Sequence, residues 1–233
     1  MSLKRALEQV RENIYESQKR GGFNHPVSIV AVTKTHPSST IEKVYDCGIR
    51  KIGENRVQEF ERKNKELPQL EGIKKHMIGH LQKNKIKKAL ELFDTIDSID
   101  SVSLAKKIDK NVKTKAPPVS VLLEVNTSNE KTKFGFSPNE IEEMVFCCLL
   151  ENISVGGLLT IGPRTKEIKE TRKSFALLRV VLERINKQLP PGAAPCTELS
   201  MGMSGDYRVA VEEGSTTVRL GTALFGARRT IIT

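Results

Sequence analysis

The sequence of 233 residues has no tryptophan and only three tyrosines and eight phenylalanines. Proteins that bind single-stranded nucleic acid stack bases on aromatic rings, and few rings are available here for such a surface. The formal net charge of +10 at pH 7 would favour an anionic partner. The basic residues, however, are spread over several expected elements and interleaved with acidic and apolar ones. We therefore interpret them as solvated helix faces and expect no nucleic-acid partner.

Long apolar runs are also missing. None approaches the roughly 20 residues that a membrane span needs, and residues 1–20 are charged and lack the apolar segment of a signal peptide. The four cysteines show no C-x-x-C spacing, so free thiols are expected rather than a disulfide framework or a metal site. We expect no membrane association and a cytoplasmic protein, with a mitochondrial location left open.

No linker rich in proline, glycine or serine divides the chain, which predicts a single domain over residues 1–233. Apolar runs alternate with amphipathic stretches, as is typical of βα units. Strands are predicted at residues 27–33, 50–53, 75–79, 95–99, 119–125, 155–161, 198–201 and 217–220. Helices are predicted at residues 2–20, 38–47, 57–66, 83–92, 102–113, 138–150, 166–188 and 206–213, with a short closing helix after the last strand.

Eight such repeats predict an α/β fold, a single (β/α)8 barrel of the TIM type with an extra N-terminal helix. A doubly wound open sheet is the alternative. It would usually carry a glycine-rich dinucleotide fingerprint after the first strand, and residues 33–37 (TKTHP) do not match one. We therefore favour the barrel.

The loops after the carboxyl ends of the strands form the active face of such a barrel. Lys34 directly follows the first strand, where partial desolvation would lower the pKa of its ammonium group and suit it to Schiff-base formation. The alternative is an ordinary lysine that extends into solvent. The other polar residues expected at these ends are Glu54, Asn55, His80, Asp100, Asn126, Thr160 and Arg219.

The loops after the seventh and eighth strands have the composition of a phosphate site. Residues 201–206 (MGMSGD) and 219–222 (RLGT) combine small residues, hydroxyls, a guanidinium group and a helix start. Oriented N–H groups at helix starts attract phosphate, although ordinary turn glycines are the alternative explanation. A Schiff-base lysine that faces a phosphate site would bind an aldehyde carrying a phosphate. Pyridoxal 5′-phosphate is the obvious candidate.

Seven segments, in order and at matching spacing, resemble the pyridoxal-phosphate homeostasis proteins over nearly the whole chain. They are residues 30–35 (VAVTKT), 53–55 with 57–59 (GEN and VQE), 76–85 (HMIGHLQKNK), 124–128 (EVNTS), 157–162 (GLLTIG), 198–204 (ELSMGMS) and 214–226 (GSTTVRLGTALFG). The resemblance implies a barrel like the N-terminal domain of alanine racemase, as in fold type III proteins, with the cofactor on Lys34 as an internal aldimine. It also implies a role in vitamin B6 homeostasis, in which the protein buffers the cofactor or delivers it to pyridoxal-phosphate-dependent apo-enzymes without robust turnover.

The resemblance further implies roles for single residues. Arg219 would face the pyridine nitrogen, Asn55 would lie close to the ring, and the phosphate would be held by Met203, Ser204, Gly221 and Thr222. A permanent cation at the ring nitrogen would keep it unprotonated and weaken the ring as an electron sink. Two positions depart from the family pattern, Arg56 and Lys75, where aromatic residues are expected, and both concern the rim.

An amino-acid racemase of this fold is the alternative function. It would need a second base opposite the lysine, typically a tyrosine from another domain or subunit. The positions of Tyr15, Tyr45 and Tyr207 in helices favour packing, and we expect no second domain after Thr233. His76 falls within a strand and is expected to be structural, so we predict no catalytic residue. We expect a monomer, because the sequence shows no exposed apolar interface.

Overall fold

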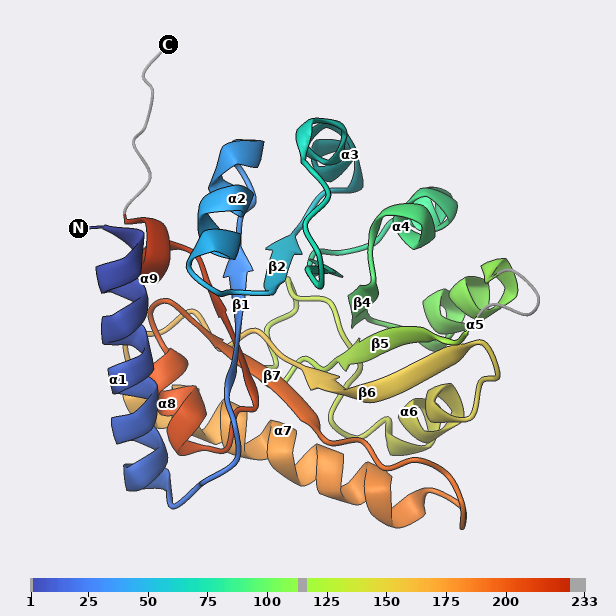
Figure 1. Cartoon of the computed structure of the whole chain (residues 1–233). Coiled ribbons are helices and arrows are strands. Elements are labelled where there is room, and N and C mark those ends of the chain that lie inside the picture. Colours follow the sequence, from blue (N-terminus) through green and yellow to red (C-terminus); the bar gives the residue numbers. More distant parts are fainter. Residues whose placement is uncertain (1, 113–116, 227–233) are drawn as a thin grey trace.

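The computed structural model describes residues 2–112 and 117–226, and these form a closed barrel of parallel strands in the order β1 to β8 (Figure 1). β1 pairs with β2 on one side and closes the barrel against β8 on the other. The predicted α/β barrel is thereby confirmed. The strands are β1 (Ser28–Val32), β2 (Lys51–Glu54), β3 (Lys74–Met77), β4 (Thr95–Ile99), β5 (Val119–Glu124), β6 (Ile153–Leu159), β7 (Glu198–Met203) and β8 (Thr217–Leu220).

Helices connect successive strands and surround the barrel (Figure 1). The expected helix at residues 83–92 is a short 3-10 turn, η1 (Lys83–Lys85), followed by α4, and residue 113, the expected end of another helix, lies outside the described residues. No helix in residues 2–112 or 117–226 is long and apolar enough to span a bilayer. The helices are α1 (Leu3–Gly21), α2 (Ser38–Asp46), α3 (Val57–Glu66), α4 (Ile86–Leu92), α5 (Val102–Asn111), α6 (Ile141–Cys148), α7 (Ile168–Gln188), α8 (Tyr207–Glu212) and α9 (Thr222–Phe225).

The additional N-terminal helix α1 begins at a serine cap and ends at a glycine in the left-handed conformation. Ser2 Oγ accepts a hydrogen bond from Arg5 N. The helix ends at Gly21, one residue beyond the expected end, and the capping residue Gly22 has φ 74°. α1 lies along α8 and α9 (Figure 1), where Asn13 Nδ2 donates to the Tyr207 hydroxyl at 2.8 Å. The extra helix therefore packs against the helices that follow the last two strands.

Side chains alternate along each strand between the surrounding helices and the barrel interior. Val218 and Leu220 belong to the apolar cluster between sheet and helices, so Arg219 between them points into the barrel. By the same alternation, Leu123 faces the helices and Glu124 faces inward. The interior thus contains charged groups from several strands below its carboxyl-terminal mouth.

Candidate functional site

Strand register brings Lys34 and Asn55 to the same mouth. Val32 of β1 pairs with Gly53 of β2, and Lys34 and Asn55 each follow these paired residues by two positions. The alternation of side chains directs both of them inward. Lys34 is half-buried, and Asn55 Oδ1 is buried without a hydrogen-bond partner among the described residues. The mouth therefore presents an amine and an unmatched acceptor from neighbouring strands.

The loop after β8 lies against β1. Ala31 pairs with Leu220, and the ring of His36, two residues after Lys34, contacts the ring of Phe225 with 4.7 Å between centroids. Gly221 and the exposed Thr222 directly follow Leu220. Two of the four residues expected to hold a phosphate, Gly221 and Thr222, thus directly follow the strand that pairs with β1.

Ser204 ties the β7 and β8 loops together. Its Oγ accepts hydrogen bonds from Gly221 N at 3.2 Å and from Ala223 N at 3.0 Å. The sequence predicted available N–H groups at the helix start after β7, whereas the two N–H groups that Ser204 Oγ binds belong to the loop after β8. Met203 is also not a loop residue but the last residue of β7, 39% exposed, and its N–H donates to Asp206 Oδ1 at 2.5 Å.

Close approach of α8 to β7 requires glycine at position 202. Gly202 has φ 95°, and a Cβ there would lie 2.6 Å from Ala210 Cβ and 2.8 Å from Tyr207 Cα. A larger residue would push α8 away from the strand and displace the loop that carries Ser204. The sequence singled out this glycine as part of a ligand loop, whereas the structure uses it for packing.

Arg219 is a buried cation with a fixed orientation. It is 4% exposed, and its guanidinium group donates to Ser200 O at 2.7 Å, to Ser200 Oγ at 2.8 Å and to Thr160 O at 2.8 Å. Burial lowers the pKa of Arg219, while the nearby carboxylates of Asp97 and Glu124 raise it. Because an arginine starts from a pKa above 12, the group stays charged at neutral pH.

Two inward carboxylates were missed by the sequence analysis. Glu124 is 7% exposed, and burial raises its pKa to about 7, with Arg219 acting in the opposite direction. Asp97 Oδ2 lies 2.8 Å from His76 Nδ1, and Asp97 Oδ1 accepts from Thr95 Oγ1 at 2.7 Å. His76 is thus hydrogen-bonded, as expected. An acidic residue inside an apolar strand was the available signal, since such residues are rarely buried without a partner.

Of the other polar residues expected at the strand ends, several stabilise the rim. His80 Nδ1 lies 2.9 Å from Asp100 Oδ2, and the His80 ring stacks on Phe134 with 4.0 Å between centroids. Asn126 Nδ2 donates to Glu130 O at 2.9 Å and so closes the loop after β5. These contacts indicate that His80, Asp100 and Asn126 stabilise the loops at the rim of the barrel.

Tyr207 packs in the apolar core, as expected, and the other two tyrosines lie beside basic side chains. Tyr207 is 6% exposed and bonded to Asn13, whereas Tyr15 is 57% exposed beneath the Lys19 ammonium group. Tyr45 stacks with the guanidinium group of Arg50, 3.8 Å from the ring centroid. None of these contacts places a phenol opposite Lys34.

The expectation of solvated basic helix faces is wrong for Lys63 of α3. Its side chain is 9% exposed and lies 2.8 Å from Glu54 Oε1. Glu54, expected among the mouth residues, points outward from the barrel towards this helix, and its Oε2 has no partner among the described residues. Burial raises the pKa of Glu54, and the bond from Lys63 lowers it.

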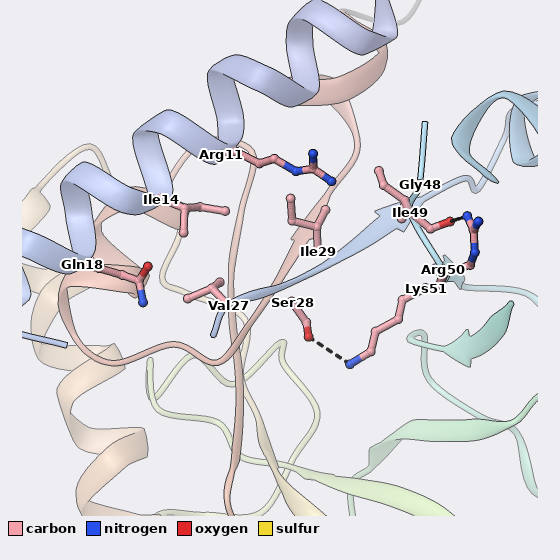
Figure 2. Close-up of a pocket in the computed structure, with 10 residues that line it drawn as sticks. All are labelled: Arg11, Ile14, Gln18, Val27, Ser28, Ile29, Gly48, Ile49, Arg50 and Lys51. Carbon is pink, nitrogen blue, oxygen red and sulfur yellow. Dashed lines mark hydrogen bonds between the residues drawn. The ribbon is translucent and has the colours of Figure 1, made fainter. Parts of the chain in front are cut away.

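Two hollows of similar size lie at opposite ends of the strands. One, of about 380 Å³, is at the mouth and is lined by Asn55, Arg56 and His80 among others. The other, of about 360 Å³, lies between α1 and the amino-terminal ends of β1 and β2, where Ser28 and Lys51 begin their strands (Figure 2). In the described part of the chain, no group of three or more His, Cys, Asp or Glu side chains is arranged to hold a metal ion.

Comparison with known proteins agrees with this geometry. The family model for the N-terminal domain of alanine racemase matches residues 6–229. A pyridoxal phosphate homeostasis protein from Aquifex aeolicus is 38% identical over 225 residues, which cover 96% of this chain and 97% of that protein. The chain belongs to the pyridoxal phosphate homeostasis family. The resemblance drawn from the sequence motifs is therefore confirmed.

Solved structures similar to this chain share its whole fold. A protein described only as unknown from Bifidobacterium adolescentis is 38% identical, with a TM-score of 0.89 over 96% of this chain and 94% of that one. PipY from Synechococcus elongatus PCC7942, solved with PLP bound, is 34% identical, with a TM-score of 0.84 over 97% of this chain and 100% of PipY. Members of the family thus superpose over nearly their full length.

Proposed function

We propose that this protein binds pyridoxal 5′-phosphate at the carboxyl end of its barrel, as a Schiff base with Lys34. The observation that carries the proposal is the single mouth that combines Lys34, the unmatched acceptor of Asn55 and the joined loops of Ser204 and Gly221. The amine would bind the aldehyde of this cofactor, the acceptor would lie at the edge of its ring, and the two loops would hold its phosphate. The bound cofactor in PipY supports the same assignment.

The phosphate would be held by Met203, Ser204, Gly221 and Thr222, the residues that the two loops bring together. Because Ser204 Oγ already accepts two N–H bonds, its own hydrogen remains to donate to a phosphate oxygen. Thr222 adds a second, exposed hydroxyl beside it. The hydroxyls, rather than bare N–H groups, would therefore make the first contacts with the anion.

Arg219 would face the pyridine nitrogen and Asn55 the ring. When bound, pyridoxal phosphate supplies an aldehyde carbon that can pass from one amine to another. The fixed cation of Arg219 would keep a neighbouring nitrogen unprotonated, which disfavours carbanion chemistry. The residues present therefore suit retention and exchange of the cofactor.

The cellular role that follows is cofactor homeostasis without robust turnover. The protein would buffer pyridoxal phosphate and deliver it to dependent apo-enzymes, acting as a monomeric single domain in the cytoplasm. The names of the relatives support a homeostasis role. The packing of Tyr207 speaks against it as the second base that a racemase needs.

The first experiment is a visible absorption spectrum with pyridoxal phosphate, followed by borohydride reduction and peptide mass mapping. We expect an imine band and a reduced adduct on Lys34, both lost in Lys34→Ala and retained in Lys51→Ala. Lys51, at the other end of the barrel, is the matched control. An adduct scattered over surface lysines, or no band, would overturn the binding proposal.

A second pair of assays separates carrier from enzyme. The loaded protein should restore activity to a pyridoxal-phosphate-dependent apo-enzyme, and this transfer should be lost in Lys34→Ala. A pure amino-acid enantiomer should keep its optical activity in the presence of the loaded protein. Racemisation that depends on Lys34 would instead establish the racemase alternative.

A further inference from the structure

A buried charged cluster lies behind the main chain that carries Lys34. Lys63 Nζ donates to Thr33 O at 2.9 Å, to Glu54 Oε1 at 2.8 Å and lies 2.8 Å from Glu59 Oε1. An ammonium group has three hydrogens, so these three oxygens use its full donor capacity. We call Glu54, Glu59 and Lys63 the α3 cluster, after the helix that supplies two of its members.

The α3 cluster holds the peptide groups on both sides of Lys34. On the preceding side, the Thr33 carbonyl accepts from Lys63, and the Thr33 hydroxyl donates to Glu54 Oε1 at 2.7 Å. On the following side, Thr35 N donates to Glu59 Oε1 at 2.5 Å. The peptide groups before and after Lys34 are thus both connected to the Lys63 ammonium group, the first directly and the second through Glu59.

Thr35 shows why such anchors are needed. Its φ of 65° lies in the left-handed region, which β-branched residues rarely occupy. The chain therefore turns sharply and unfavourably immediately after Lys34. The bond from Thr35 N to Glu59 stabilises this turn, and Lys63 in turn holds Glu59 in place.

The charges of the α3 cluster are consistent with a firmly held arrangement. Burial acts to raise the pKa of Glu59, but the bonds from Lys63 and Thr35 N hold it below its usual value. Removing Lys63 would leave two carboxylates with side chains 1% and 17% exposed and no cation between them. We expect the loss of this cation to disturb the chain segment that both carboxylates bind.

We propose that Lys63, with Glu59 and Glu54, is a positioning residue that directs Lys34 into the mouth. Alternation along β1 points Thr33 towards the helices and Lys34 into the barrel, so the α3 cluster acts from the opposite side of the strand. This inference rests on the proposed function of Lys34. It assigns no contact with the cofactor to the α3 cluster.

Correct positioning of Lys34 should affect formation of the imine bond with the cofactor rather than binding of its phosphate. Imine formation would join Lys34 Nζ, in its uncharged form, to the aldehyde carbon, and the two amine hydrogens would leave with the aldehyde oxygen as water. An amine displaced from its correct position forms this bond more slowly, and small misplacements cost up to about 100-fold in rate. The phosphate loops follow β7 and β8, whereas the α3 cluster contacts the chain that follows β1.

The test compares Lys63→Met with Lys65→Met, a matched change two residues along the same helix at an exposed position. Two ligands are used, pyridoxal phosphate and pyridoxamine phosphate, which has no aldehyde and binds without a bond to Lys34. For Lys63→Met we expect the rate of imine formation, followed by the visible band and by the borohydride adduct on Lys34, to fall about 10- to 100-fold. Its affinity for pyridoxamine phosphate should stay within about twofold, a change of under 1 kcal/mol.

Glu59→Gln provides the milder variant if Lys63→Met does not fold. It weakens the anchor at Thr35 and removes the ion pair between Lys63 and Glu59, but it keeps the bonds from Lys63 to Thr33 and Glu54. We therefore expect a smaller fall in the same rate. Circular dichroism establishes folding in each case.

Two results would overturn the inference. One is an unchanged rate of imine formation in the folded variant, and the other is an equal loss of affinity for both ligands, which indicates general damage. These outcomes are distinct from failure of the proposed function, which is read in the wild-type protein. If wild type forms no adduct on Lys34, the proposed function is wrong; if wild type reacts and the variant matches it, only the positioning role is wrong.

Discussion

The two ends of the barrel use their positive charges differently. At the amino-terminal end, Arg11, Arg50 and Lys51 line the hollow of Figure 2, and Lys51 Nζ donates to Ser28 Oγ at 3.2 Å. Arg50 is exposed and bonds to nearby main-chain carbonyls. At the carboxyl-terminal end, Arg219 is buried with three hydrogen bonds that fix its direction.

The comparison shows that the volume of a hollow and its basic lining do not identify a site. The two hollows measure about 360 and 380 Å³, and the one with more cations has no unmatched buried acceptor such as Asn55. Groups held in one direction and removed from water can recognise a ligand, whereas solvated cations mainly attract anions without selecting among them. The following predictions test this difference between the two ends.

The largest difference should come from removing one arginine at each end. We expect Arg219→Met to lower the free energy of unfolding by about 3–5 kcal/mol, because Asp97 and Glu124 lose their buried counter-charge. Arg50→Met should lower it by less than about 1 kcal/mol, since an exposed cation is already solvated. Urea denaturation of both variants measures this, and equal losses would contradict the distinction.

Glu124 should make the mouth end sensitive to pH. Its pKa is about 7 in the folded protein against an ordinary value of 4.5, so the unfolded chain loses this proton first as pH rises. The stability contribution is full below about pH 4.5 and is lost towards pH 7, by on the order of 3 kcal/mol.

Glu124→Gln should remove this fall, as seen in unfolding free energies between pH 4.5 and 8. Arg50→Met is the control at the other end and should keep the wild-type pH profile. A Glu124→Gln profile as steep as that of wild type would show that this carboxyl group does not titrate in this range.

Serine hydroxyls at the two ends offer a smaller test. Ser204→Ala leaves two partly buried N–H groups without their acceptor, and we expect a loss of about 1–2 kcal/mol. It should also weaken the protection that pyridoxamine phosphate gives against thermal unfolding. Ser28→Ala, which affects one bond to Lys51, should cost less than about 0.5 kcal/mol and leave that protection intact. Equal protection in Ser204→Ala and wild type would remove Ser204 from the phosphate site.

The smallest effect is expected at Lys51. Lys51→Met should change stability by less than about 0.5 kcal/mol and leave pyridoxal phosphate affinity unchanged, because the amino-terminal hollow takes no part in binding. Absorption titration measures the affinity. A loss of several-fold in Lys51→Met would show that the comparison between the two ends is wrong.

Much of the fold follows from local patterns. Every strand predicted from its apolar run is present, and errors are confined to their ends, as at β7, which continues to Met203. The position of Lys34, Gly221 and Thr222 at the mouth could also be predicted from the sequence, because a barrel places the carboxyl ends of all its strands at one mouth. Periodicity and topology were sufficient for these residues.

The remaining features depend on contacts between distant parts of the chain. Lys63 has the sequence environment of a solvated helix lysine, yet it is buried because Glu54 and Glu59 meet it behind β1. The apolar strand around Glu124 signalled that its carboxyl group is buried, but the approach of Arg219 to it depends on the closed barrel. The local sequence does not show which charged side chains are buried, because the residues that exclude water from them belong to other strands and helices.

The sequence by itself therefore determined the barrel, its order of elements, the family and the lysine at the mouth. These properties depend on hydrophobic period, turn residues and motif spacing, which are local. Only the tertiary structure decided the direction of that lysine, the use of Ser204 as the link between two loops and the burial of the α3 cluster. Each of these requires specific distances between residues far apart in the chain, and those distances exist only once the sheet has closed.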